Sequence, residues 1–204
     1  MHVARSIPRH RFLAGAFVAS ATALLRGVTP AVADGARTGP WCRDLTKGVR
    51  ETSYDFSLNL LDGKGDVFTL SDLVGRPVWL NFFATWCPPC NAEMSDIIRL
   101  ASRFAPEIHV IGIDVAEEPA KVRAFRDRHS VPFPIALDEK ASVFHSFGFS
   151  ELPTHMFLDA RGYISCISVG DLLPNQMDNE IAVALSRKPM PHAKSVSLGR
   201  TSEG

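Results

Sequence analysis

The stretch VWLNFFATWCPPCNAEM, residues 78–94, decides the fold of this chain. Residues 78–83 are almost all apolar and β-prone, as expected for a central strand that is covered on both faces. From Pro88 to Phe104 the apolar side chains recur at helical spacing and form one stripe. Cys87 and Cys90 therefore lie where a buried strand ends and a helix begins.

Two cysteines separated by two residues can close a small disulfide ring. At the first turn of a helix, the leading sulfur faces unpaired backbone N–H groups and the positive end of the helix dipole. This environment favours the thiolate form of Cys87, which is the expected attacking sulfur. Cys90 lies deeper in the helix and is the expected resolving sulfur of the mixed disulfide. Pro88 and Pro89 stiffen the ring and lack donors that a first helical turn leaves unused.

The cysteine pair has two other interpretations. Half of a zinc site would need a second pair or His partners at ligand spacing, but Cys42 and Cys166 are each isolated, so no metal site is expected. A purely structural disulfide would not need Trp86 and two prolines at a strand-to-helix junction. A C-x-x-C pair in a strand-helix context is typical of a redox motif.

Outside this stretch, strand and helix patterns alternate along the chain. A hairpin is predicted from Phe56 to Leu70, with a turn at residues 62–65. The later elements are predicted as a strand at 108–115, a helix at 119–129, short pieces through 147, a hairpin at 154–169 and a helix at 175–186. This order predicts an α/β fold, a mixed sheet with helices on both faces and an extra N-terminal β-hairpin.

The two ends differ from the body of the chain. Residues 1–33 resemble a signal peptide, with arginines before an uncharged run of 14 residues and Ala31-Val32-Ala33 as a cleavage signal. We predict cleavage before Asp34 and a periplasmic or otherwise exported protein; an uncleaved anchor is the alternative, but the run is short for a span of about 20 residues. Residues 34–53 are predicted as an irregular lead-in, 54–187 as the domain and 188–204 as a disordered tail.

The charge balance bears on possible partners. The chain has 204 residues with 22 basic and 22 acidic side chains. Loss of residues 1–33 removes four arginines and no acid, which leaves 22 minus 4, or 18, basic residues and a balance of −4. A nucleic-acid partner would need a concentrated basic face, so none is expected.

Two separate motifs resemble one known family. Residues 81–94 and residues 152–159 resemble the active-site signature and the cis-proline loop of the TlpA/ResA-like thioredoxins, which are exported proteins that usually reduce disulfides. The resemblance implies a thioredoxin-like fold, no cofactor beyond the cysteines, protein disulfides as substrates, a membrane electron donor and a monomer. It also implies a cis Leu152–Pro153 bond beside Cys87, so that Leu152, Pro153 and Trp86 form the substrate-binding surface.

The resemblance assigns a role to Glu93. Thioredoxin usually carries a buried acid on the strand before the motif, where this chain has Asn81, which does not titrate. In the resembling family, an acid at the position of Glu93 acts near the disulfide and is expected to relay a proton to or from Cys90. A solvated helix glutamate is the alternative. Glu151 and His155 depart from the family pattern, and we interpret both as variation.

Cys42 and Cys166 remain outside the motif. In an exported protein, a structural disulfide between them is favoured, since it would hold the N-terminal lead-in. Two free buried thiols are the alternative.

The predicted function is reduction of exported protein disulfides, as in cytochrome c maturation or metal-site assembly. A disulfide oxidase or isomerase is the alternative within the same chemistry, because direction depends on a reduction potential that the residues alone do not define. A Cu(I)-binding metallochaperone is the alternative of another class.

Overall fold

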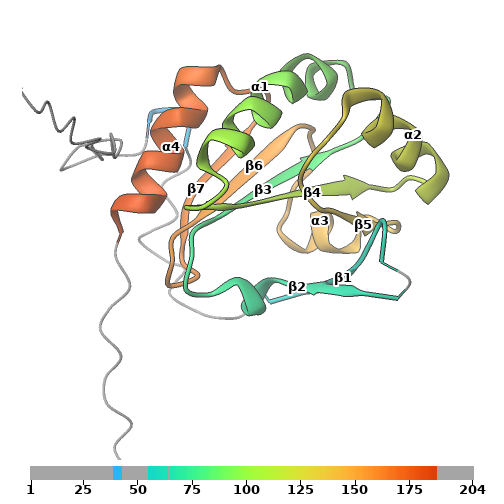
Figure 1. Ribbon diagram of the computed structural model, residues 1–204, viewed down its shortest axis with the longest axis horizontal. Helices are drawn as coiled ribbons and strands as arrows, with labels where there is room; N and C mark the ends of the chain where they lie inside the picture. The colour runs from blue at the N-terminus through green and yellow to red at the C-terminus, as the bar shows by residue number, and fades with distance from the viewer. Residues whose placement is uncertain (1–38, 43–54, 64, 188–204) are drawn as a thin grey trace, which may run out of the picture. The chain divides into compact units, whose positions relative to one another are not determined.

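The computed structural model describes residues 39–42, 55–63 and 65–187, and Figure 1 shows their arrangement. In this part of the chain, seven strands form one sheet in the order β2-β1-β5-β4-β3-β6-β7. The strands are β1 (Ser57–Leu60), β2 (Val67–Thr69), β3 (Val78–Phe83), β4 (His109–Val115), β5 (Ile135–Asp138), β6 (Thr154–Leu158) and β7 (Ile164–Val169). The helices are η1 (Leu70–Leu73), a 3-10 turn, and α1 (Pro88–Phe104), α2 (Pro119–His129), α3 (Ser142–Ser146) and α4 (Pro174–Ser186).

The sheet is mixed, and its centre is parallel. β3 pairs with β4 and β4 with β5 in parallel, while β6 and β7 continue the sheet antiparallel beyond β3. The hairpin of β1 and β2 joins the other edge through antiparallel pairing of β1 with β5. The predicted mixed α/β fold with an extra N-terminal hairpin is therefore confirmed. The last helix begins at Pro174 rather than at residue 175, because proline suits the first helical position.

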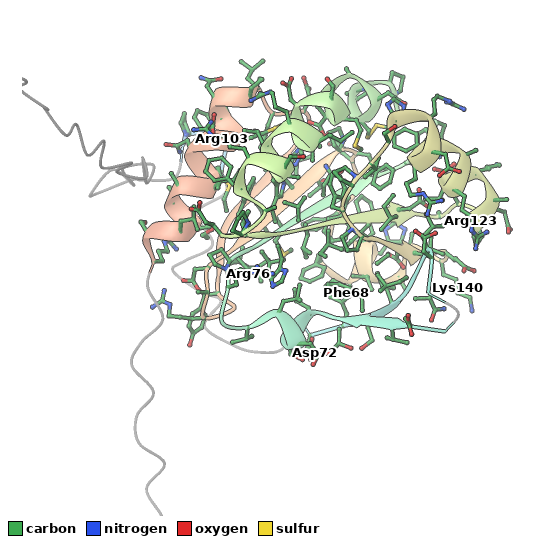
Figure 2. All side chains as sticks on the ribbon, in the orientation of Figure 1. Phe68, Asp72, Arg76, Arg103, Arg123 and Lys140 are labelled. Atoms are coloured by element: carbon green, nitrogen blue, oxygen red, sulfur yellow. A yellow bond between two sulfur atoms is a disulfide. The ribbon has the colours of Figure 1, made fainter. Side chains whose placement is uncertain are left out.

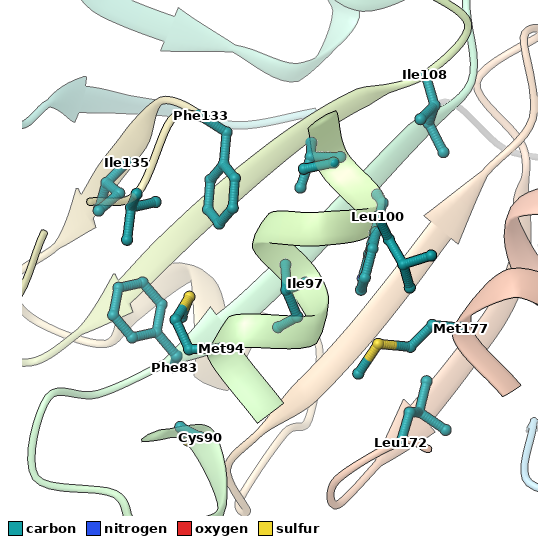
Figure 3. Packing of buried hydrophobic residues seen from close by; sticks show 14 of the residues in the cluster. Phe83, Cys90, Met94, Ile97, Leu100, Ile108, Phe133, Ile135, Leu172 and Met177 are labelled. Atoms are coloured by element: carbon teal, nitrogen blue, oxygen red, sulfur yellow. The ribbon is translucent and has the colours of Figure 1, made fainter. Parts of the chain in front are cut away.

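Alternation along β3 divides the core into two clusters. Trp79 and Phe83 belong to the cluster on the side of α1, α2 and α4, which holds Met94, Ile97 and Met177 (Figure 3). The opposite-facing side chains of β3, Val78, Leu80 and Phe82, belong to the second cluster, which holds residues of α3. All six residues of β3 are buried, as expected for a central strand.

The two faces of the sheet are covered unequally. Three helices lie over one face, where Arg103 of α1 reaches Asp178 of α4 at 3.2 Å (Figures 1 and 2). The other face receives the five-residue α3 and a group of aromatic rings, in which Phe82 and Phe149 meet edge to face with centroids 5.3 Å apart. The prediction of helices on both faces is confirmed, with the larger share on the face of α1.

The N-terminal residues that the structure describes, 39–42, are attached to this framework at two points. A disulfide joins Cys42 to Cys166 of β7. The carboxylate of Glu180, fully buried in α4, accepts hydrogen bonds through Oε1 from the backbone N–H of Gly39 at 2.9 Å and from the indole N–H of Trp41 at 3.1 Å. The sequence pattern of the last helix did not single out Glu180. Burial raises the pKa of its carboxyl group, and these hydrogen bonds lower it in part.

Several predictions fall outside the described residues. They are the signal peptide at 1–33, the rest of the lead-in at 34–38 and 43–53, and the tail at 188–204. Among the helices that are described, none combines the length and the apolar character that a membrane crossing requires.

The Cys42–Cys166 disulfide closes a loop with a sequence separation of 124 residues. We expect the double variant Cys42→Ala/Cys166→Ala to lose about 2–5 kcal/mol of unfolding free energy, because the cross-link restricts the unfolded chain. Urea unfolding followed by circular dichroism measures this loss. The control is a count of thiols in oxidised wild-type protein after denaturation without reductant: none should react, and two reactive thiols would contradict the bridge.

Candidate active site

The cysteine pair lies where the chain passes from β3 into α1. The N–H of Cys87 donates to the carbonyl of Ala84 at 3.2 Å, which turns the chain after the strand. Cys87 is the N-cap of α1, and Pro88 and Pro89 occupy the first helical positions. A disulfide joins Cys87 to Cys90, and the Cys90 backbone N–H points at the Cys87 sulfur at 3.3 Å. The leading sulfur thus receives a helix N-terminal donor, as a thiolate would require.

The two sulfurs differ in exposure. Trp86, just before the pair, is 67% exposed, whereas Cys87 is 3% exposed and Cys90 is fully buried. Cys90 belongs to the core cluster below the pair, where it lies at the start of α1 (Figure 3). Both residues are buried, and of the two only Cys87 keeps some exposed area.

The loop before β6 carries the second motif. The Leu152–Pro153 peptide bond is cis. The Thr154 hydroxyl donates to the Glu151 carbonyl at 2.7 Å, and the Pro153 carbonyl accepts the Gly170 N–H at 2.8 Å. Leu152 is half-buried and packs against the cluster that contains both cysteines, while Glu151 is exposed. The loop is thus tied to its own strand and to the end of β7.

Glu93 lies one turn beyond Cys90 and is only 5% exposed. Its Oε1 accepts from the Asn81 amide at 3.3 Å, and its Oε2 accepts from the backbone N–H of Leu172 at 3.2 Å. His155 Nε2 lies 3.2 Å from the same Oε2. The interpretation of Glu93 as a solvated helix residue is therefore wrong. Residues three apart on a helix are neighbours, so Glu93 follows Cys90 on the same side of α1.

His155 was missed as a site residue, because its departure from the family pattern was interpreted as variation. It is fully buried on β6, directly across from Asn81 in the β3–β6 register. Its Nδ1 lies 3.3 Å from the Trp79 indole nitrogen. Strand alternation after Pro153 was the available signal, since it places residues 155 and 157 on one face; the pairing with β3 was not visible in the sequence.

The loop between β3 and α1 is also held by the side chains of Glu117 and Asn91. The Thr85 hydroxyl donates to Glu117 at 2.8 Å, and the Thr85 backbone N–H donates to the same carboxylate. The Asn91 amide donates to the carbonyls of Thr85 at 3.0 Å and Cys87 at 2.7 Å. The residue before Trp86 is therefore anchored through its hydroxyl, its N–H and its carbonyl. Glu117 was not predicted, because it lies 32 residues from Thr85 and becomes its neighbour only through the β3–β4 pairing.

Asp114, near the end of β4, is a neighbour of Glu117. It is fully buried and pairs in register with Phe83, the last residue of β3. Burial raises the pKa of Asp114 to about 8, and the neighbouring carboxylates of Glu117 and Asp138 add to the increase. At neutral pH, Asp114 is therefore mostly protonated, which avoids a second negative charge beside Glu117.

One group of metal-ligand side chains occurs among the described residues. Cys42, Cys166 and Glu180 place their ligand atoms within 4.8 Å of one another. The two sulfurs are joined in a disulfide, so they have no thiolate to offer a metal ion. This geometry holds the N-terminal segment rather than an ion.

A thioredoxin-like sheet that ends in a C-x-x-C disulfide at a helix N-terminus defines a thiol-disulfide oxidoreductase. The profile of the AhpC/TSA family matches residues 49–167, and the chain belongs to this family.

Curated relatives and solved structures agree with this class. The chain is 36% identical over 139 residues to the thioredoxin-like protein YneN of Bacillus subtilis, covering 66% of this chain and 80% of that protein. It is 29% identical over 161 residues to the thiol-disulfide oxidoreductase ResA of Geobacillus kaustophilus, covering 78% and 91%. A putative thiol:disulfide interchange protein DsbE from Chlorobium tepidum superposes with a TM-score of 0.58 at 26% identity, covering 64% and 93%. The resemblance to ResA-like thioredoxins is confirmed.

The raised pKa of Asp114 predicts a pH dependence of stability. Between about pH 4, near its unfolded pKa, and about pH 8, the folded state binds the proton that the unfolded state has lost. The stability contributed by Asp114 is thus complete below about pH 4 and is lost as pH rises to about 8, by at most about 1.4 kcal/mol per pH unit.

Asp114→Asn keeps the shape of the protonated carboxyl but cannot ionise. We expect this variant to show a flatter decline in unfolding free energy than wild type between pH 5 and pH 9, measured by urea unfolding. Asp96→Asn on the outer part of α1 serves as the control and should follow the wild-type curve. Parallel curves for wild type and Asp114→Asn would contradict a buried, protonated Asp114.

Proposed function

We propose that this protein is exported and reduces disulfides in other exported proteins, with Cys87 as the attacking and Cys90 as the resolving sulfur. The observation that carries the proposal is the contrast between the two sulfurs. Cys87 has the Cys90 N–H at 3.3 Å and the only exposed area of the pair, while Cys90 is fully buried one helical turn before Glu93. An accessible, donor-stabilised sulfur is suited to attack, and a buried one to resolution.

The first step consumes the reduced pair. The Cys87 thiolate attacks one sulfur of a substrate disulfide, the substrate S–S bond breaks, and the other substrate sulfur leaves as a thiolate and takes a proton. Trp86 and the Leu152–Pro153 loop would form the docking surface, with the exposed indole on one side of Cys87. Extended substrate backbone would pair beside Leu152 as a short strand.

The second step releases the product. The Cys90 thiol transfers its proton to Glu93 and attacks the Cys87 sulfur, so the mixed disulfide breaks and the second substrate thiolate leaves. The substrate gains two electrons, and the Cys87–Cys90 disulfide forms. A dithiol donor in the membrane would then reduce this disulfide by the same exchange in reverse.

The buried carboxyl group of Glu93 supports the reductive direction. Strong oxidants of this class owe their high potentials to a stabilised reduced form. A carboxylate one helical turn from Cys90 disfavours a second negative charge on the sulfurs, which destabilises the reduced pair as a thiolate. The protein would therefore give up electrons more readily than an oxidant does. Cytochrome c maturation and metal-site assembly are the processes in which such a reductant would act.

Cysteine substitutions test the assignment of the two sulfurs. We expect Cys87→Ser to lower insulin-disulfide reduction to background, since the nucleophile is lost. Cys90→Ser should instead accumulate a mixed disulfide with the substrate, detectable by mass spectrometry without reductant, because nothing resolves it. Equal turnover in wild type and Cys87→Ser would remove the enzymatic proposal and leave Cu(I) binding by the pair as the function to measure.

The reduction potential tests the direction. Equilibration of the Cys87–Cys90 pair with glutathione buffers, followed by thiol alkylation, should give a potential more negative than about −150 mV. A potential above that value would identify an oxidase or isomerase. Glu93→Gln is the matched variant, and its potential should rise at pH 7 because the opposing charge is removed.

Export and processing are tested on the full-length chain expressed with its N-terminus intact. We expect the periplasmic fraction of a bacterial host to hold a protein that begins at Asp34, as read by intact mass, and that elutes as a monomer in size-exclusion chromatography. Membrane-bound protein with the mass of the uncleaved chain would show an anchor instead.

A further inference from the structure

We propose that His155 is a positioning residue for the reductase reaction, a neutral hydrogen-bond donor that orients the Glu93 carboxylate to take the proton from Cys90. This inference rests on the proposed function, because it deepens the role assigned there to Glu93. It goes beyond the motifs, in which residue 155 had no role. The geometry that carries it is a chain of buried hydrogen bonds from Trp79 through His155 to Glu93.

The partners of His155 determine which ring nitrogen carries its proton. An indole N–H is a donor only, so Trp79 Nε1 at 3.3 Å requires His155 Nδ1 to accept. The Asn81 amide nitrogen lies 3.4 Å from the same Nδ1 and donates to it as well. Nδ1 is therefore unprotonated, and in the neutral ring the proton lies on Nε2. That proton points at Glu93 Oε2 across 3.2 Å.

The same partners keep the ring neutral. A doubly protonated imidazole would present a second N–H at Nδ1, where Trp79 and Asn81 offer donors and no lone pair. The ring is also held in place, since the Trp79 indole stacks on Phe157 with centroids 5.1 Å apart and lies 6.0 Å from the His155 ring. His155 therefore acts as a fixed donor and does not exchange the proton itself.

Glu93 is thereby left as the group that changes charge. The side-chain N–H groups of Asn81 and His155 and the backbone N–H of Leu172 all donate to its carboxylate. Neutral donors stabilise the anion without removing its ability to take a proton, which suits a general base. Loss of the His155 donor would leave Oε2 with the Leu172 N–H alone and would free the carboxylate to rotate away from Cys90.

The elements packed around the ring add no other charge to this network. β3 presents Trp79 and Asn81, α1 presents Glu93, and Ser168 of β7 is the register partner of His155. Within residues 39–42, 55–63 and 65–187, Glu93 is the charged side chain in hydrogen-bond contact with His155. A pH effect of changing His155 would therefore be transmitted through Glu93.

Two substitutions at position 155 separate the N–H that is donated to Glu93 from the acceptor that is offered to Trp79. In His155→Asn, the shorter amide can still accept from Trp79 but does not reach Glu93. In His155→Gln, the longer amide can place an N–H near the position of Nε2. Stopped-flow tryptophan fluorescence of the mixed-disulfide resolution step, from pH 5 to pH 9, is the measurement.

We expect His155→Asn to slow resolution about tenfold with an unchanged KM and a displaced pH–rate profile, a part of the 10²–10⁴ that a general base contributes. His155→Gln should stay within about threefold of wild type. Glu93→Gln should slow resolution by about 10² or more, and adding His155→Asn to it should change the rate no further. A wild-type rate and profile in His155→Asn, with Glu93→Gln slow, would overturn the inference.

If the proposed function is wrong, the resolution rates of the variants should show a different pattern. A wild-type rate in Glu93→Gln would remove the proton relay itself, whatever His155 does. Nitrogen-15 spectra of oxidised wild-type protein test the inference without any variant, even if His155→Asn does not fold. They should show a neutral ring protonated on Nε2 at pH 7, and a ring protonated on Nδ1 would overturn the assignment.

Discussion

Placement of the Cys87 sulfur at the end of a fully buried strand is the constraint on which the site depends. β3 is hydrogen-bonded on both sides, to β4 and to β6. Each of these pairings places one polar side chain close to the residues that follow β3. The β4 side supplies Glu117, which anchors Thr85, and the β6 side supplies His155, which contacts Glu93. Glu117 thus holds the residues that follow β3, while Glu93 of α1 is in contact with β6 through His155.

Two buried acids near the site, Glu93 and Asp114, have different surroundings. Glu93 is buried, and three N–H groups point at its carboxylate. Asp114 is buried next to Glu117, and burial together with that neighbouring charge raises its pKa to about 8. The first arrangement supplies a buried carboxylate with hydrogen-bond donors, while the second avoids a negative charge beside Glu117.

The apolar surroundings of the cysteines follow from the same arrangement of β3 and α1. Cys90 belongs to an apolar cluster with Met94 and Ile97, so a charged state of its sulfur is costly unless a proton acceptor is close. Glu93 occupies the next turn of the same helix, and the proposed function assigns it as this acceptor. The Cys87 sulfur differs, since the Cys90 backbone N–H in the first turn of α1 donates to it.

Short-range pattern in the sequence determined the elements and the cysteine motif. The apolar run of β3, the helical stripe of α1 and the prolines after Cys87 are local signals, and each element formed where they predicted it. His155, Glu117 and Glu180 were not recognised, because each acquires its partner from a residue at least 32 positions away. Strand pairing and helix docking decide such contacts, and no local periodicity records which strands become neighbours. The sequence by itself therefore determined the cysteine motif and its place between a strand and a helix, while the tertiary structure decided which buried polar groups become partners.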